Sequence, residues 1–396
     1  MSTSTGPDLF AADFVADPYP VFDLLRRHSP VRAVEVPTGR LWLITRYADA
    51  RQVLTDPRLT TRLPSEAAGP GLGSPDVHRM LTEHMLNADP PEHTRLRRLV
   101  SKVFTPARIE RLRPRVQEIA DALVDAMLDR RQGDLIADFA FPLPITVICE
   151  MLGVPLHDRD SFRAWSNTIT ASMASGVDDR VPAESLAAYI LELIAAKRAT
   201  LGDDLLSELI AVRDGGDRLT GGELVAMVFL LLIAGHETTV NLIGNGMYLL
   251  LTHPDQRRRL VDDPALVPTA VEEFLRYESP VETSSPRFTT EPVEVAGVTI
   301  PAGELVLVVL ASANRDPERF ADADWFDVAR RESPHVAFGH GIHFCLGAPL
   351  ARLEGRIAFE TLLRRLPGLS LAVPPAALAW RPGILLRGLV DLPVRW

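Results

Sequence analysis

The strongest constraint on the fold is one long apolar segment, which continues almost unbroken from residue 224 to residue 251. Before it, Thr220 and Glu223 have the spacing of a capping box, and His253-Pro254 follows it. These signals predict a single helix from Thr220 to about Thr252, roughly 48 Å long at 1.5 Å per residue. A helix of that length crosses a whole domain, so the rest of the chain has to pack around it.

The same segment is long enough to span a membrane. His236, Glu237 and Asn241 lie at its centre, where charged and polar side chains are costly in lipid. Residues 1–7 carry neither a basic group nor an apolar stretch, so they do not look like a signal peptide. We therefore expect a buried helix in a soluble, cytoplasmic protein without a membrane anchor.

Composition favours a mainly α fold with a small β region. Hydrophobic residues make up 46% of the chain but aromatic residues only 6%, and Ala and Leu are abundant. With 2 cysteines in 396 residues, the chain has no disulfide scaffold and fits a reducing compartment. The formal net charge of −10 argues against nucleic-acid binding.

Neither a Gly/Ser-rich linker nor an internal repeat divides the sequence, so we predict one domain over residues 1–396. Helical periodicity dominates from about 92 to 277. Residues 62–90 are rich in Gly, Pro and Ser and predict a long functional loop. A β-rich sub-region is expected mainly from about 30–46, 280–310 and 368–396, and it begins with a hairpin that turns at residues 37–39.

Cys345 lies in a loop with the sequence FGHGIHFCLG, residues 338–347. Gly339 and Gly341 would let such a loop lie flat against a bulky planar group. Leucines at helical spacing follow from Leu346, so Cys345 is expected at a helix N-terminus. There the backbone dipole favours a thiolate over a thiol.

Three interpretations of Cys345 compete. The simplest is an ordinary buried or free thiol. A zinc site with His335, His340 and His343 is the second, but paired spacings such as C-x2-C do not occur. A single thiolate behind a glycine-rich, aromatic-flanked loop fits a haem iron better. The other cysteine, Cys149, lies in an apolar helical run and is expected in the core.

The centre of the long helix, residues 234–239, interrupts the apolar run with Ala-Gly-His-Glu-Thr-Thr. Gly235 leaves room for a diatomic ligand or a substrate, and Thr238 can bond back into the helix and distort it. The metalloprotease motif H-E-x-x-H is excluded because residue 240 is Val. A polar defect in a long core helix is the alternative interpretation.

A second helix is predicted from the cap pattern Asp89-Pro-Pro-Glu92 to about Phe104. His93 and Arg97 fall on its inward stripe. A buried cation needs an anionic partner, and the sequence supplies no obvious one. Ligand binding is one interpretation of this pair, and a satisfied core or interface histidine is the other.

The opposite face of that helix is basic. It carries Arg95, Arg98 and Lys102, in a stretch from 93 to 115 that has few acids. On an acidic chain such a patch indicates docking of an acidic partner, although a solvated helix face is the default interpretation.

Glu273 and Arg276 stand at i, i+3 on one helix face. Taken alone they predict a surface ion pair worth about 0.3–0.5 kcal/mol. Glu272, at i, i+4 from Arg276, is the alternative partner.

Together these motifs resemble the cytochrome P-450 superfamily of haem-thiolate monooxygenases over nearly the whole chain. The chain is most similar to soluble actinobacterial enzymes that hydroxylate macrolides and other polyketides. The resemblance implies a triangular, mostly helical prism with a small β region. It also implies haem b, iron protoporphyrin IX, with Cys345 as the axial thiolate ligand.

The resemblance assigns roles to further residues. Glu237 and Thr238 match the acid–alcohol pair that delivers protons. The family's propionate contacts correspond to His93, Arg97, Arg287 and His343. Other haem contacts implied are Phe338, Gly339, Ala234 and Gly347. A structural network beneath the haem corresponds to Glu273, Arg276 and Arg330.

Substrate contacts are expected from mainly apolar residues, which indicates a large hydrophobic molecule. They are Met85, Leu86, Leu230, Ala234, Glu237, Val281, Ser284, Ile384 and Leu385, with further contacts from Phe162–Val181. A macrolide or polyketide is expected. A steroid, terpenoid or xenobiotic is the alternative.

The implied reaction inserts one oxygen atom of O2 into a C–H or C=C bond. Neither a flavin nor a nicotinamide fingerprint appears, so we expect electrons from a ferredoxin and its reductase, docking near Arg95, Arg98 and Lys102 on a monomer. A peroxygenase or isomerase would not need Glu237 and Thr238. A haem-based sensor would normally need an output domain, and none is evident.

Overall fold

The computed structural model describes residues 8–36, 39–62, 74–159, 161, 164–165, 168–169, 180–213, 215–331 and 333–396. The chain forms two compact units. Residues 1–61, 120–140 and 238–396 make up the first, here called the sheet-bearing unit. Residues 62–119 and 141–237 make up the second, the helical unit. The fold is mainly helical with small sheets, as predicted.

The long predicted helix is α12 (Gly221–Thr252), of 32 residues. Its capping box is present: the backbone N–H of Thr220 donates to Glu223 Oε2 at 2.8 Å, and the N–H of Glu223 donates to Thr220 Oγ1 at 3.2 Å. By length and hydropathy α12 would suit a membrane, but 72% of its most apolar window is buried in the protein. It is a core helix, as the polar residues at its centre indicate.

The main sheet lies in the sheet-bearing unit and has five strands in the order β1-β2-β8-β5-β3. Their bounds are β1 (Val31–Val36), β2 (Gly39–Ile44), β8 (Leu305–Val308), β5 (Arg287–Thr289) and β3 (Leu59–Thr60). Strands β1 and β2 are antiparallel with Val36 opposite Gly39, which confirms the predicted hairpin. Strand β2 pairs with β8 in parallel.

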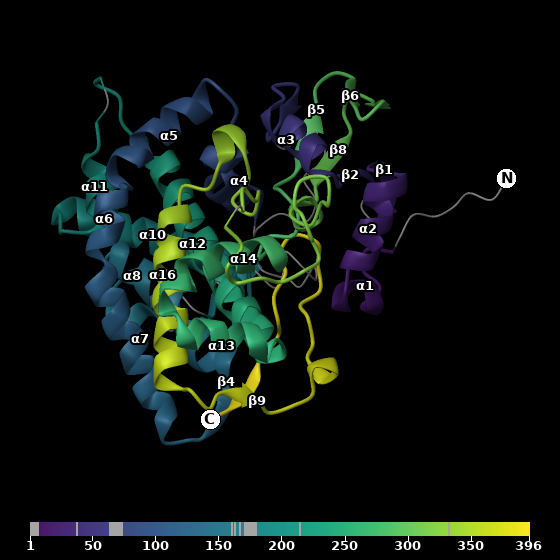
Figure 1. The fold of residues 1–396 in the computed structure, drawn as a ribbon. Coiled ribbons are helices and arrows are strands. Elements are labelled where there is room, and N and C mark those ends of the chain that lie inside the picture. Colours follow the sequence, from purple (N-terminus) through teal and green to yellow (C-terminus); the bar gives the residue numbers. More distant parts are fainter. Residues whose placement is uncertain are drawn as a thin grey trace. The chain divides into compact units, whose positions relative to one another are not determined.

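Both faces of this sheet are buried. Alternate residues of a strand point to opposite faces, so each face packs against a different set of residues. Ile44 and Val306 pack with residues of α3 (Tyr47–Thr55). Leu43 and Leu307 pack with residues of α2 (Tyr19–His28). Figure 1 shows these two helices beside the strands. Two smaller sheets pair β6 (Val293–Val295) with β7 (Val298–Ile300), and β4 (Gln132–Asp134) and β9 (Ser370–Leu371) with β10 (Pro393–Arg395).

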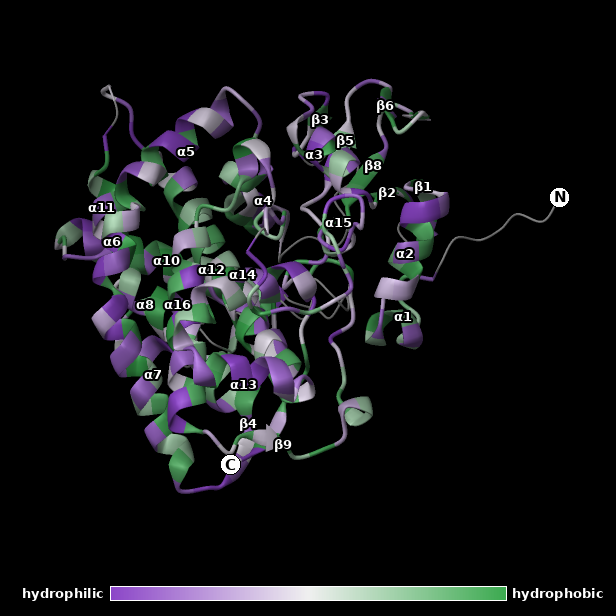
Figure 2. Cartoon of the chain, viewed as in Figure 1, coloured by the Kyte–Doolittle hydropathy of each residue, from purple (hydrophilic) through white to green (hydrophobic). Residues whose placement is uncertain are grey.

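The remaining helices fall into both units. The sheet-bearing unit has α1 (Ala12–Ala16), α13 (Pro254–Asp262), α14 (Val267–Tyr277), α15 (Leu310–Ala313) and α16 (Ala348–Arg365). The helical unit has α4 (Pro75–Thr82), α5 (Glu92–Val103), α6 (Pro106–Arg111), α8 (Pro142–Met151), α10 (Arg180–Ala199) and α11 (Leu205–Ala211). Helix α7 (Arg113–Leu128) contributes to both and alternates between hydrophilic and hydrophobic residues (Figure 2), as a helix with one buried face does.

Two local predictions need correction. Residues 63–73 of the predicted 62–90 loop lie outside the described residues, but the rest contains α4, whose N–H at Val77 is capped by Ser74 Oγ at 3.4 Å. Helix α5 begins at Glu92 with Pro91 as its N-cap, and no side chain caps it. Asp89 accepts from the N–H of His93 only through its backbone carbonyl, and the carboxylate of Glu92 binds Arg62 at 2.9 Å instead.

Candidate functional site

The Cys345 loop is closed by its own backbone. The N–H of Cys345 donates to the carbonyl of Phe338 at 2.9 Å. Gly339 and Gly341 adopt φ of +73° and +77°, which favours glycine, and a Cβ on Gly341 would lie 3.0 Å from the carbonyl oxygen of Leu54. Cys345 is exposed and precedes the first residue of α16 by three positions. The loop therefore presents an accessible thiol close to a helix N-terminus.

The side chains around Cys345 fit a metal ion whose other ligands come from a cofactor and not from the protein. Within the described ranges, no group of three or more His, Cys, Asp or Glu side chains could hold a metal ion. Of the three histidines weighed for zinc, His335 bonds to Glu272 at 3.1 Å, and His340 Nε2 accepts from Arg51 Nε at 3.3 Å. A single accessible thiolate in a glycine-shaped loop suits an iron whose other ligands come from a porphyrin.

The residues in the middle of α12 differ in exposure. Ala234 is exposed, although Leu232 and His236 next to it are buried. A Cβ at Gly235 would lie 3.3 Å from Ile148 of α8, so glycine there permits close packing of these two helices. Room for a ligand beside Gly235 stays a prediction.

Glu237 is buried, with 2% of its surface exposed, and Thr238 is half-buried. The neighbouring His236 is fixed by a contact of 2.8 Å between Nδ1 and the Leu232 carbonyl, and by an edge contact with the Phe141 ring. His236 Nε2 lies 3.8 Å from Glu237 Oε2. A carboxyl group next to an imidazole inside the protein is suited to holding and passing a proton.

Four basic residues were predicted to bind propionates, and they are divided between the units. His93 and Arg97 lie one turn apart on α5 of the helical unit, and burial followed by the Arg97 charge lowers the pKa of His93. Arg287 is in β5, with 4% of its surface exposed, and His343 ends the short 3-10 turn Gly341–His343, both in the sheet-bearing unit. Their propionate contacts stay a prediction.

Two segments predicted to contact substrate lie side by side in the sheet-bearing unit. Val281 is bridged to Leu386, and Thr283 Oγ1 donates to the carbonyl of Ile384 at 2.8 Å. The hydroxyl of Ser284 serves the backbone, because it donates to the Ser285 carbonyl at 3.0 Å and accepts from the N–H of Val308 at 3.2 Å.

In the helical unit, Met85 is buried in a 3-10 turn (Met85–Asn87) with Leu86 beside it, and Leu230 is buried in α12. Of Phe162–Val181, residues 162–163, 166–167 and 170–179 lie outside the described residues.

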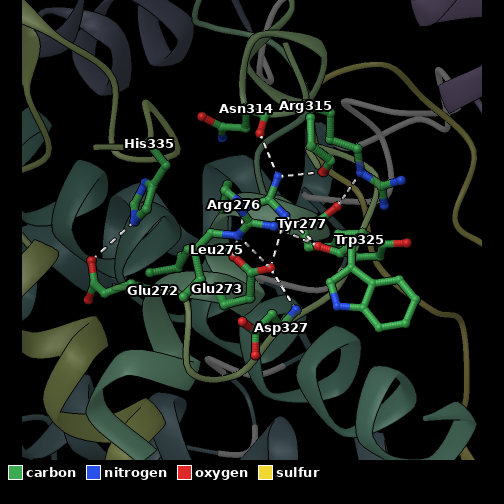
Figure 3. Close-up of polar contacts among 12 residues, drawn as sticks. Glu272, Glu273, Leu275, Arg276, Tyr277, Asn314, Arg315, Trp325, Asp327 and His335 are labelled. Carbon is green, nitrogen blue, oxygen red and sulfur yellow. Dashed lines mark hydrogen bonds and ion pairs between the residues drawn. The ribbon is translucent and has the colours of Figure 1, made fainter. Parts of the chain in front are cut away.

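Glu273 and Arg276 form a buried pair, with both side chains fully shielded from solvent. Arg276 donates to the two oxygens of Glu273 at 2.7 and 2.9 Å, and Arg330 lies 3.2 Å from the same carboxylate. Figure 3 shows this carboxylate also accepting from the N–H of Asp327 at 3.0 Å. Arg276 further donates to the carbonyls of Asn314, Ala323 and Trp325 at 2.7–3.2 Å. The network thus fastens α14 to the irregular segment that leads to the Cys345 loop.

Comparison with known proteins decides the family. A family model described as "Cytochrome P450" matches residues 21–370, which is most of the chain. The protein belongs to the cytochrome P450 family.

Relatives of this P450 extend over its whole length. Cytochrome P450 monooxygenase PikC of Streptomyces venezuelae is 51% identical over 97% of the chain and 92% of its own length. The 6-deoxyerythronolide B hydroxylase of Saccharopolyspora erythraea is 45% identical over 99% of both. The crystal structure of the myxobacterial P450 CYP267B1 with myristic acid superposes with a TM-score of 0.92, at 45% identity and 98% coverage of both chains.

The protein is therefore a P450 monooxygenase related to macrolide and polyketide hydroxylases, and its cofactor is haem with a thiolate axial ligand. The family also uses O2 and external redox partners.

The partners of Glu272 are distant in sequence and were not predicted. This carboxylate does not bind Arg276. It accepts from Arg352 at 2.7 and 2.8 Å and from His335 at 3.1 Å. Although burial acts in the opposite direction, these hydrogen bonds lower the pKa of Glu272 from 4.5 to about 2. Arg352 lies seven residues after the thiolate, and that short spacing was the only sequence signal that could have drawn attention to it.

The predicted docking face of the P450 also changes. Arg95 is ion-paired with Glu223 and, at 3.3 Å, with Asp217, so two carboxylates compensate its charge. Lys102 is exposed and donates to the carbonyl of Arg213 at 3.1 Å, and Arg98 is exposed. Arg95 therefore holds α5 against the start of α12, and the basic surface of α5 consists of Arg98 and Lys102.

Proposed function

We propose that this P450 inserts one oxygen atom of O2 into a C–H bond of a large apolar macrolide or polyketide. The observation that carries the proposal is the accessible Cys345 thiol in its glycine-shaped loop before α16. The substrate class is supported by 45% identity, over nearly the whole chain, to 6-deoxyerythronolide B hydroxylase. The mainly apolar residues expected to contact substrate support the same class.

Each candidate residue has a definite task in this proposal. Cys345 holds the haem iron through its thiolate. Arg287 and His343, with His93 and Arg97, bind the propionates, for which arginine is suited because it can donate two parallel hydrogen bonds to one carboxylate. When bound, haem supplies the activation of O2 and the transfer of one oxygen atom to the substrate.

The chain itself supplies protons and excludes water. The buried carboxyl of Glu237, whose Oε2 lies 3.8 Å from His236 Nε2, would pass a proton to the hydroxyl of Thr238. The paired segments around Val281 and Ile384 give an apolar wall that positions the substrate and keeps bulk water away.

Electrons come from a separate protein donor. We infer a ferredoxin with its reductase, attracted to Arg98 and Lys102 on α5. We also infer a cytoplasmic monomer in which residues 1–396 act as one catalytic domain. Apart from α12, no described helix is long and apolar enough for a membrane span.

The iron ligand is tested with Cys345→Ala. The wild-type protein, reconstituted with haem, reduced and treated with carbon monoxide, is expected to show the absorption band characteristic of thiolate-ligated haem, and the variant is expected to lack it. Cys149→Ala is the matched control, because Cys149 is fully buried in α8 and should leave the band unchanged. A band that persists in Cys345→Ala would refute the assignment.

The substrate class is tested by the spectral shift of the ferric protein on titration with a panel of macrolactones, linear polyketides, steroids and terpenoids. Macrolactones or polyketides should bind more tightly than the other two classes. Preferential binding of steroids or terpenoids would replace the proposed substrate class and leave the monooxygenase assignment in place.

A further inference from the structure

Arg352 is held over an aromatic ring of the Cys345 loop. Its guanidinium carbon lies 4.6 Å from the centre of the Phe338 ring, a cation–π distance. The carbonyl of Phe338 accepts the hydrogen bond from the N–H of Cys345. Arg352 lies on α16 and all three residues belong to the sheet-bearing unit. A fixed positive charge therefore stands beside the backbone segment that carries the thiolate.

A fixed negative charge balances it. Glu272 of α14 accepts two parallel hydrogen bonds from Arg352, at 2.7 and 2.8 Å. His335 holds the same carboxylate from another side. His335 Nδ1 accepts from the N–H of Ala337 at 3.2 Å, so its Nε2 carries the hydrogen and donates to Glu272 at 3.1 Å (Figure 3). Phe338 at one end and His335 at the other thus fix the orientation of the Arg352–Glu272 pair.

Arg352 interacts electrostatically with the thiolate. Its pKa is raised first by the hydrogen bond to Glu272, and the negative charge of Cys345 raises it further. The His335 ring, 5.8 Å from the Phe338 ring, completes the packing around the loop. The charge of Arg352 therefore acts on the thiolate through a partly buried region, where solvent screens it less than at the surface.

Other charged groups face the pair from one side. A cavity of about 240 Å³ opens on Glu272 and is lined by Pro268, Thr269, Arg330, Arg331 and Ser333. Arg330 is paired with Glu273. The cavity reaches Glu272, whose side chain is 25% exposed and whose two oxygens are bonded to Arg352 and His335.

We propose that the Glu272–Arg352 pair sets the reduction potential of the bound haem, with Arg352 favouring the reduced state, Glu272 opposing it, and His335 and Phe338 fixing the geometry. This inference rests on the proposed ligation of haem by Cys345. Reduction adds one electron, supplied by the external protein donor, and so adds one negative charge to the haem–thiolate site. A nearby cation favours that addition and a nearby anion disfavours it.

The test is a spectroelectrochemical titration of the haem-loaded protein and two variants. In Glu272→Gln the Arg352 charge is no longer balanced, and the equilibrium constant for one-electron reduction should rise about tenfold, which is about 59 mV. In Arg352→Gln the Glu272 charge is unbalanced, and the constant should fall by a similar factor. The double variant should return close to the wild-type potential.

Matched controls change the same charges elsewhere in the unit. Glu360→Gln alters an exposed carboxylate on α16, and Arg258→Gln alters an exposed arginine on α13. Both should leave the potential unchanged. Shifts of the two test variants in the same direction would overturn the proposal, because loosened packing or water entry around the loop affects both alike. The absence of any shift would overturn it as well.

If either glutamine variant does not fold, conservative variants are measured in its place. Arg352→Lys and Glu272→Asp keep the charges and lose the two-point geometry, so each should stay within about threefold of the wild-type equilibrium constant. A larger change in either would refute a charge effect. The carbon monoxide band separates the two proposals: its absence from wild-type protein refutes ligation by Cys345, whereas its presence without opposite shifts refutes only the present inference.

Discussion

Two glutamates of this P450, the half-buried Glu272 and the buried Glu282, have pKa values on opposite sides of the ordinary one. Glu272, bonded to Arg352 and His335, has a pKa of about 2. Burial raises the pKa of Glu282 from 4.5 to about 8, and the charge of nearby Glu278 adds to that rise. Arg387 lowers it, but this guanidinium forms its hydrogen bond with Glu278. The two glutamates therefore differ in pKa because Glu272 accepts hydrogen bonds from charged and polar donors, whereas burial dominates at Glu282.

We predict that Glu282→Gln makes the folded protein more stable than wild type at alkaline pH. Folding raises the pKa of Glu282, so the folded protein binds this proton more tightly than the unfolded chain. Its contribution to the free energy of unfolding is complete below pH 4.5 and is lost as the pH rises towards about 8. At pH 8 the variant should be more stable than wild type by roughly 1–3 kcal/mol.

The measurement is the thermal unfolding midpoint of the haem-loaded protein at pH 5.5 and at pH 8. The wild-type midpoint should fall between the two values by more than that of the variant. Glu294→Gln, which removes an exposed carboxylate of β6, is the control and should follow wild type. Equal pH dependence in wild type and Glu282→Gln would contradict the prediction.

A second prediction at this scale concerns proton delivery. Thr238→Ala should lower the product formed per electron pair consumed, with a loss of about 10²-fold in the rate of product formation, because a positioned acid or its relay contributes that order. Consumption of reductant should continue. The measurement compares product, reductant and peroxide in one assay. Thr252→Ala, which removes a hydroxyl at the end of the same helix, should leave the ratio unchanged. A normal ratio in Thr238→Ala would exclude the proposed task.

At the scale of elements, helix α12 was predicted well from the sequence and helix α4 was missed. The bounds of α12 follow from Thr220, Glu223 and the terminating His253-Pro254, which lie next to the helix in sequence. Helix α4 was missed because Gly, Pro and Ser around it indicate a loop, although Ser74 is its N-cap. An N-cap depends on residues next to the helix, so it can be recognised from the sequence. The low helix propensity of a short segment is a weaker signal, because packing in the folded protein overrides it.

The link between α14 and the segment before the Cys345 loop is expected to be a main source of stability. Glu273→Gln leaves the buried guanidinium of Arg276 without its carboxylate, and the free energy of unfolding should fall by about 3–5 kcal/mol. Urea unfolding of the haem-loaded protein measures this. The exposed pair of Arg259 and Asp327 is the comparison, since Arg259→Gln should cost less than about 1 kcal/mol. Similar losses of unfolding free energy in both variants would contradict the expectation that the buried pair contributes more than the exposed one.

At the scale of the whole molecule, a net charge of −10 coexists with a basic patch on α5. Long-range repulsion would slow the approach of an acidic donor to most of such a surface, and a local basic patch would favour docking there. Figure 2 shows α5 as a largely hydrophilic helix. The ion pairs of Arg95 reduce that patch to Arg98 and Lys102.

We predict that the double variant Arg98→Glu/Lys102→Glu slows the first electron transfer from ferredoxin about tenfold at low ionic strength, because electrostatic steering is lost. The difference should shrink as salt screens the charges. Stopped-flow reduction with excess ferredoxin gives the rate. The control Arg27→Glu/Arg258→Glu makes the same charge change at exposed positions of the sheet-bearing unit and should react like wild type. Unaltered rates in the α5 variant would exclude this docking face.

The amino-acid sequence by itself determined the features whose interacting groups lie within a few residues of one another. These are the capping box and length of α12 and the pairing of Glu273 with Arg276 at i, i+3. Residues three or four positions apart are neighbours on a helix surface, so a short pattern is enough to propose such pairs.

Only the tertiary structure decided how the remaining charges are partnered. Glu272 binds Arg352, 80 residues away, and Arg95 binds Glu223, 128 residues away. It also showed that Gly235 packs against Ile148 and that Ala234 is exposed. The physical reason is that a charged side chain pairs with whichever opposite charge the fold brings within a few ångströms, and sequence separation carries no information about that distance.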